Sequence, residues 1–77
     1  MDNEIVSNLF YPVSYWKSPK KEAISELRDC YEKHTKSYIS ANDFKLGLQN
    51  LGYEVNDYSV KLRMKKDIRK KYFSNGF

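Results

Sequence analysis

The sequence predicts a single small α+β domain, with helices first and a basic β-hairpin last. Between residues 40 and 55 the apolar side chains repeat with helical spacing, whereas between residues 60 and 65 apolar and basic side chains alternate strictly. The first pattern is typical of a helix with one buried face, and the second of a strand with one buried face. A chain of 77 residues has room for one thin core, so we expect residues 1–77 to form one domain.

The first helix is expected over Asp2–Phe10. Asp2 is a preferred N-cap residue, and Glu4 suits the positively polarised first turn. The apolar side of this segment consists of Ile5, Val6, Leu9 and Phe10. Such a short helix needs tertiary packing to be stable in water, and Pro12 ends it.

The second helix is expected over Ser18–Thr35. Ser18 can cap its first turn, and Pro19 stands at the first helical position, where a missing N–H costs no hydrogen bond. One apolar stripe carries Ala23, Leu27 and Tyr31, with Ile24, Cys30 and His34 at its margins. The lone Cys30 is expected to be a small buried apolar residue rather than half of a disulfide.

The third helix, within Ser40–Val55, is the clearest in the chain. Ser40 is a preferred N-cap, Asp43 follows it as in a capping box, and Gly52 suits a left-handed C-terminal cap. The buried stripe contains Phe44, Leu48 and Leu51, and the opposite face carries Asn42, Lys45 and Gln49. The short connection Lys36–Ile39 joins this helix to the preceding one, which predicts a helix-turn-helix.

The C-terminal third is predicted to form a basic β-hairpin, with Asn56-Asp57 as a turn signal before it. The apolar positions Val60, Leu62 and Met64 alternate with the basic positions Lys61, Arg63 and Lys65. Lys66-Asp67 would then turn the chain, and Ile68–Phe73 would return as the second strand. The alternative is an all-α small bundle, because a helical repeat fits the same segment. That repeat consists of Val60, Met64, Ile68 and Tyr72.

The charge of the chain is strongly asymmetric. The net charge is +4, but residues 1–40 carry six basic and six acidic side chains, whereas residues 58–77 carry seven basic side chains and one acidic one. This local charge of +6 (seven minus one) predicts a polyanionic partner for the C-terminal third.

No enzyme active site is expected. The sequence contains neither a nucleophile-histidine-acid set, nor a glycine-rich phosphate loop, nor a cluster of metal ligands, so no catalytic residue, metal site or cofactor is predicted. His34 is interpreted as a helix-end residue. The sequence contains no apolar run long enough to cross a membrane and no basic N-terminal leader. We therefore expect a cytoplasmic protein with no membrane partner.

Three groups of residues carry a resemblance to a known family. They are Ser25, Glu26, Leu27 and Tyr31; then Ser40, Phe44, Leu48, Leu51, Gly52 and Tyr53; and then the basic segment Val60–Phe73. Over residues 22–77 the chain resembles the winged-helix domain at the C-terminus of phage-type and poxvirus-type primase-helicases. The resemblance implies a winged-helix fold, and a replication accessory or regulatory role in a phage or mobile element.

A competing resemblance rests on Glu26-Leu27-Arg28, Tyr38-Ile39-Ser40 and Leu51-Gly52-Tyr53. These segments are similar to one helix-loop-helix unit of an EF-hand, whose loop would span residues 32–43. A calcium loop needs oxygen ligands at its first, third, fifth and twelfth positions. His34 and Lys36 stand at two of these positions, so this unit would be degenerate and would bind a partner but no calcium.

Two functions follow as hypotheses. The first is nucleic-acid binding, with DNA as the ligand: the third helix would contact base edges and the wing would contact phosphates. The predicted contact residues are Asn42, Lys45 and Gln49 on the helix, and Lys61, Arg63, Lys65, Lys66, Arg69, Lys70 and Lys71 on the wing. The second is a protein–protein interaction module for a larger replication protein, a capsid protein or a host protein. A helical C-terminal segment, and exposure of Tyr15, Trp16 and Phe73, would favour the second.

Overall fold

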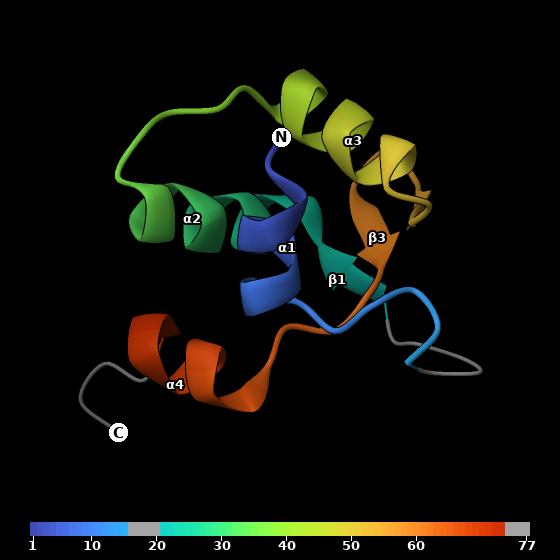
Figure 1. Ribbon diagram of the computed structural model, residues 1–77. Coiled ribbons are helices and arrows are strands. Elements are labelled where there is room, and N and C mark those ends of the chain that lie inside the picture. The colour runs from blue at the N-terminus through green and yellow to red at the C-terminus, as the bar shows by residue number, and fades with distance from the viewer. Residues whose placement is uncertain (16–20, 74–77) are drawn as a thin grey trace.

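The computed structural model describes residues 1–15 and 21–73, which form four helices and a three-stranded antiparallel sheet (Figure 1). The helices are α1 (Asn3–Leu9), α2 (Ile24–Thr35), α3 (Ala41–Asn50) and α4 (Lys66–Phe73). The strands are β1 (Lys21–Ala23), β2 (Glu54–Val55) and β3 (Ser59–Lys61). The predicted α+β class is therefore confirmed, and the all-α alternative is wrong.

The central strand of the sheet is β3, in the order β1-β3-β2. Val60 of β3 lies opposite Glu22 of β1 on one side and opposite Val55 of β2 on the other. An isolated bridge between Phe10 and Met64 continues the pairing beyond the sheet. Because β1 directly precedes α2 and pairs with β3, the sheet ties the beginning of α2 to the C-terminal half of the chain.

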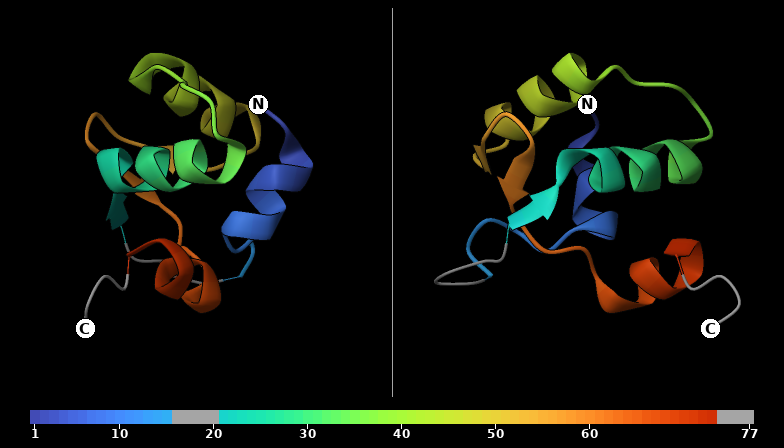
Figure 2. Two further views of the ribbon diagram at one scale, coloured as in Figure 1. Left: turned by 90° about the vertical axis from the view of Figure 1, so that its left-hand side faces the viewer. Right: turned by 180° about the vertical axis from the view of Figure 1, so that it is seen from behind.

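The hydrophobic core lies where α1, α2, α3 and the sheet meet. Its buried residues are Val6, Leu9, Phe10, Ile24, Leu27, Cys30, Tyr31, Phe44, Leu48, Tyr53, Val60, Leu62 and Met64. In every view of Figures 1 and 2, α3 lies at the top of the molecule and α4 at the bottom, with the other elements between them. The two helices therefore occupy opposite ends of the domain.

The predicted signals at both ends of α3 and at the start of α1 are confirmed. The Asp2 carboxylate accepts a hydrogen bond from the Glu4 N–H at 2.9 Å, and the Ser40 hydroxyl oxygen accepts one from the Asp43 N–H at 3.1 Å. Gly52 has φ +98°, in the left-handed region that a side chain with a Cβ adopts only with strain. Local sequence therefore sets these boundaries.

The expected start of the second helix at Ser18 is wrong over the described residues. Lys21–Ala23 is a strand, and α2 begins only at Ile24, while Ser18 and Pro19 lie outside the described residues. The reason is tertiary: Lys21–Ala23 pairs with Ser59–Lys61 across the sheet. The shift moves the buried stripe, so that Ala23 is exposed while Ile24 and Cys30 are buried.

The predicted C-terminal hairpin is only partly right. A hairpin does form around the Asn56-Asp57 turn, but its strands are β2 and β3, which lie earlier in the chain than predicted. Strict alternation of burial holds for Val60, Leu62 and Met64. The expected return strand Ile68–Phe73 is wrong, because this segment belongs to α4.

The hydrogen bonds around Met64 explain this difference. The Tyr11 N–H donates to the Arg63 carbonyl at 2.9 Å, and the Lys65 N–H donates to the Leu9 carbonyl at 3.0 Å. The segment after α1 therefore takes the place beside residues 63–65 that a return strand would have filled. The chain beyond residue 65 is free to follow its helical repeat.

Candidate functional site

The outer face of α3 presents the polar residues that the helical spacing predicts. Phe44 and Leu48 are fully buried on its inner side, so Asn42 and Gln49 are exposed and Lys45 is half-buried. The Lys45 ammonium donates to the Asp57 carbonyl at 3.3 Å, which links the helix to the turn between β2 and β3. The predicted helix residues thus share one face and lie next to the hairpin.

A groove of about 390 Å³ lies beside this face. Its lining consists of Ala23, Ile24, Ser25, Arg28, Ala41, Lys45, Asp57 and Tyr58. The Ile24 N–H donates to the Tyr58 carbonyl at 3.0 Å, and the Arg28 guanidinium donates to the Ile39 carbonyl at 3.1 Å. The beginning of α2, the side of α3 and the hairpin turn are therefore held around a common hollow.

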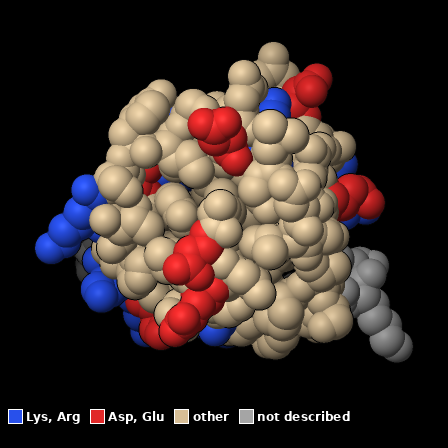
Figure 3. Space-filling model, turned by 45° about the horizontal axis from the view of Figure 1, so that its top comes forward, with Lys and Arg blue, Asp and Glu red and all other residues tan. Residues whose placement is uncertain are grey.

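The surface around α3 is not basic. Residues 41–57 contain one lysine and three acids, and Asp43, Glu54 and Asp57 are all exposed. Lys61 on β3 forms an ion pair with Glu54 at 3.1 Å, which offsets its charge. Figure 3, in which the α3 end comes forward, shows acidic side chains spread across this face and the larger group of cations along its left edge. The strong positive charge expected beside α3 is not there.

Three exposed lysines lie at the opposite end, on α4. Lys66, Lys70 and Lys71 are exposed on this helix. Arg63 and Lys65 belong to the segment that leads into it, and the Lys65 ammonium lies 6.0 Å from the centroid of the Tyr11 ring. The ten predicted contact residues are therefore divided between two ends of the molecule and do not form one surface.

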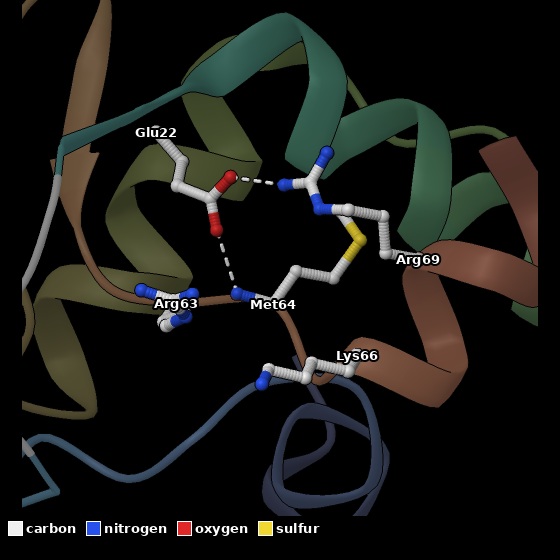
Figure 4. Close-up of a pocket in the computed structure, with 5 residues that line it drawn as sticks. All are labelled: Glu22, Arg63, Met64, Lys66 and Arg69. Carbon is white, nitrogen blue, oxygen red and sulfur yellow. Dashed lines mark hydrogen bonds and ion pairs between the residues drawn. The ribbon is translucent and has the colours of Figure 1, made fainter.

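Arg69 is directed inward, unlike the α4 lysines. Its guanidinium donates to the carboxylates of both Glu22 and Glu26. The other Glu22 oxygen accepts a hydrogen bond from the Met64 N–H at 2.7 Å (Figure 4). Burial alone would lower the pKa of Arg69, but hydrogen bonds and attraction from Glu26 and Glu22 outweigh it and raise the pKa above its usual value. Arg69 therefore attaches α4 to β1 and α2 and is not a free phosphate ligand.

The rest of the α4 attachment is also largely polar. His34 Nδ1 and the Tyr72 hydroxyl form a hydrogen bond at 2.8 Å, and the Lys33 ammonium lies 4.9 Å from the centroid of the Phe73 ring. No residue of α4 is buried, although Ile68, Tyr72 and Phe73 pack partly against the core. His34, expected to be only a helix-end residue, thus helps to hold α4.

Two residues of the groove were missed by the sequence argument. Tyr58 directly follows the Asn56-Asp57 turn signal, so an aromatic residue at the tip of a hairpin could have been noticed. Arg28 has no comparable signal, because an arginine on a helix is common and only the tertiary arrangement places it beside Lys45.

Cys30 is chemically protected. It is a free cysteine with no exposed surface, as the sequence predicts, and burial raises the pKa of its thiol to about 11. Burial also raises the pKa of Tyr53, whose hydroxyl donates to the Tyr11 carbonyl at 3.0 Å. The thiolate is the reactive form of cysteine, and a raised pKa keeps Cys30 in its thiol form at neutral pH. We therefore interpret Cys30 as a packing residue of the core.

Comparisons with known proteins were made at the levels of family, sequence and structure. No protein-family model, curated protein or solved structure matches this chain. Within residues 1–15 and 21–73, no helix has the length and apolar character to cross a membrane. Over the same residues, no three or more His, Cys, Asp and Glu side chains are grouped so that they could hold a metal ion.

Proposed function

We propose that this chain is a nucleic-acid-binding domain of the winged-helix type, with DNA as its partner and the cytoplasm as its location. A winged helix places a short β-hairpin, the wing, beside the second helix of a helix-turn-helix. Here the β2–β3 hairpin lies next to α3, which follows α2 after a short connection. The order of the elements and the central position of β3 support this proposal. A fold does not imply a function, so the ligand has to be argued from the surface.

The observation that carries the ligand assignment is the exposed charge of α4. Lys61 and Arg69 form ion pairs with carboxylates, so part of the basic charge of the C-terminal third is offset. Lys66, Lys70 and Lys71 are exposed on one helix, where they outnumber its one exposed acid, Asp67. Exposed cations of this kind bind phosphates by releasing counterions, which gives affinity without sequence information.

The two ends of the domain would contact different parts of the nucleic acid. Because α3 and α4 lie at opposite ends, we assign the larger share of phosphate binding to the α4 lysines and base contacts to the α3 face. Asn42 and Gln49 carry side-chain amides, which can hydrogen-bond bidentately to adenine. Affinity and base recognition would then come from separate surfaces.

The test is the salt dependence of DNA binding. Replacing Lys66, Lys70 and Lys71 together with Ala should weaken binding to unrelated duplex sequences alike, by about tenfold or more at low salt. The slope of log affinity against log salt should also become shallower by about 0.9 for each phosphate that the variant no longer neutralises. Fluorescence anisotropy of a labelled duplex measures both quantities.

The matched control replaces the same three lysines with Arg. This variant keeps the charge and the helix propensity of α4, so it should bind nearly as well as the original chain. Unchanged affinity and an unchanged salt slope in the Ala variant would contradict the proposal.

A protein–protein interaction module is the second candidate, because α4 is a helix and exposed apolar side chains are present. Tyr15 is 48% exposed and stacks on Tyr11 with ring centroids 4.0 Å apart, and Leu46 on α3 is 56% exposed. Phe73 is only half-buried, and Trp16 lies outside the described residues. A larger replication protein, a capsid protein or a host protein would be the partner. Absence of oligonucleotide binding at low salt would favour this candidate.

A further inference from the structure

The groove beside α3 is lined by small side chains, and backbone hydrogen bonds hold the hairpin turn at its edge. Small side chains (Ala23, Ser25 and Ala41) leave the hollow of about 390 Å³ between α2, α3 and the hairpin turn. The turn itself is closed by a hydrogen bond from the Asn56 N–H to the Ser59 carbonyl at 2.8 Å. It is joined to α2 by the hydrogen bond between the Ile24 N–H and the Tyr58 carbonyl.

Two cations line this groove, and each of them bonds to a backbone carbonyl. Arg28 donates to the Ile39 carbonyl and Lys45 donates to the Asp57 carbonyl. Across the described part of the chain, neither of them forms an ion pair with a carboxylate. A lysine ammonium has three donors and a guanidinium has five, so both retain donors for an anionic ligand after these bonds are made.

An exposed aromatic ring stands at the edge of the same groove. Tyr58 is 86% exposed, the highest value among the large apolar side chains of the described residues, although its backbone is fixed by the bonds to α2 and within the turn. An exposed ring on a fixed backbone can serve as a stacking platform, and every nucleobase has a face that can stack on it. In a duplex these faces are covered by neighbouring base pairs, whereas in a single strand they are available.

We propose that this groove binds one unit of single-stranded nucleic acid, with a base stacked on Tyr58 and an adjoining phosphate bound by Arg28 and Lys45. The inference rests on the proposed nucleic-acid function. It specifies a single-stranded ligand and the residues that bind it at the α3 end. Asp57 lies in the same lining, and its negative charge opposes a bound phosphate. The site therefore contains one residue whose neutralisation should strengthen binding.

The first experiment compares a short labelled oligothymidylate with a duplex of the same length by fluorescence anisotropy. The unaltered chain should bind the single strand more tightly. Tyr58→Ala should weaken single-strand binding by about 5- to 150-fold and should leave duplex binding through α4 almost unchanged. Tyr58→Phe keeps the ring and should restore the affinity.

Two further variants separate base stacking from a general surface effect. Tyr38 is also highly exposed, at 79%, but it does not line the groove, so Tyr38→Ala should not alter single-strand affinity. Asp57→Asn should increase this affinity by a few-fold at low salt, because a repulsive charge is removed. A merely damaged turn would not tighten binding.

The outcomes separate this inference from the proposed function. If Tyr58→Ala leaves single-strand affinity unchanged while the triple Ala variant of α4 binds weakly, the groove assignment is wrong and the nucleic-acid function stands. Equal losses for single strand and duplex in Tyr58→Ala would also overturn the single-strand assignment. If the unaltered chain binds neither oligonucleotide at low salt, both proposals are wrong and a protein ligand takes their place.

Discussion

The α3 end and the α4 end of this domain are built by different forces. α3 buries Phe44 and Leu48 completely and is capped at both ends. α4 buries no residue and is attached through Arg69, Tyr72 and partly buried apolar side chains. Hydrophobic burial therefore anchors α3, whereas hydrogen bonds and ion pairs largely anchor α4.

The contrast also applies to the surfaces that the two ends present. The α3 end has a groove with an exposed ring but little net charge, while the α4 end has exposed lysines on a weakly anchored helix. Local stability is not uniform in proteins, and weakly packed elements open more easily. The charge on which we base affinity is thus carried by a helix that contributes no fully buried residue to the core.

The largest effect on stability is expected from a core substitution in α3. Phe44→Ala should lower the free energy of unfolding by about 3–5 kcal/mol, because it leaves a cavity in the core. Ile68→Ala on α4 removes a half-buried side chain and should cost only about 1 kcal/mol. Urea unfolding followed by far-ultraviolet circular dichroism measures both. The matched control is Leu46→Ala, which alters an exposed leucine of α3 and should change little. Similar losses of stability for Phe44→Ala and Ile68→Ala would contradict the difference in anchoring between α3 and α4.

An intermediate effect is expected on the pH dependence of the free energy of unfolding. It arises from the Cys30 thiol, which lies in the core between the two ends. Burial raises the pKa of its thiol from 9.0 to about 11 in the folded chain. Between these pH values the unfolded chain binds fewer protons than the folded one, so the free energy of unfolding falls as the pH rises. The loss should reach about 2 kcal/mol near pH 11.

The measurement compares urea unfolding of the original chain and of Cys30→Ala across this alkaline range. The variant has no thiol to ionise, so its stability should fall less steeply with pH, even though other groups titrate in both proteins. Parallel slopes would show that burial does not perturb this thiol.

The smallest effect is expected from weakening the ion pair that attaches α4 to β1. Glu22→Gln keeps an acceptor for the Met64 N–H but removes the charge that binds Arg69. Because the Arg69 side chain is 43% exposed, solvent screening reduces the expected cost to about 1–2 kcal/mol. Amide hydrogen exchange should become faster in α4 and stay unchanged in α3. Glu26→Gln, at a more exposed carboxylate, should have a smaller effect, and uniform acceleration in both helices would contradict separate anchoring.

In the candidate site, the relation between residues of one helix could be predicted from the sequence, but the placement of separate elements could not. Helical spacing placed Asn42, Lys45 and Gln49 on one face, because that relation depends only on the geometry of α3. The C-terminal lysines were expected on a wing that contacts the same nucleic acid as this face, but their position depends on where the chain turns after residue 65. Tyr58 and Arg28 became neighbours of one groove only when α2 and the hairpin turn came together.

The elements whose signals are local could be predicted from the sequence. The Ser40 cap, the left-handed Gly52, the Asn56-Asp57 turn and the alternation from Val60 to Met64 all follow from side-chain chemistry within a few residues. Long-range contacts were needed to make Lys21–Ala23 a strand and residues 66–73 a helix. In both places two backbone conformations suit the local sequence, and hydrogen-bond partners far away in the chain select one: β3 for Lys21–Ala23, and the segment after α1 for the residues that precede α4.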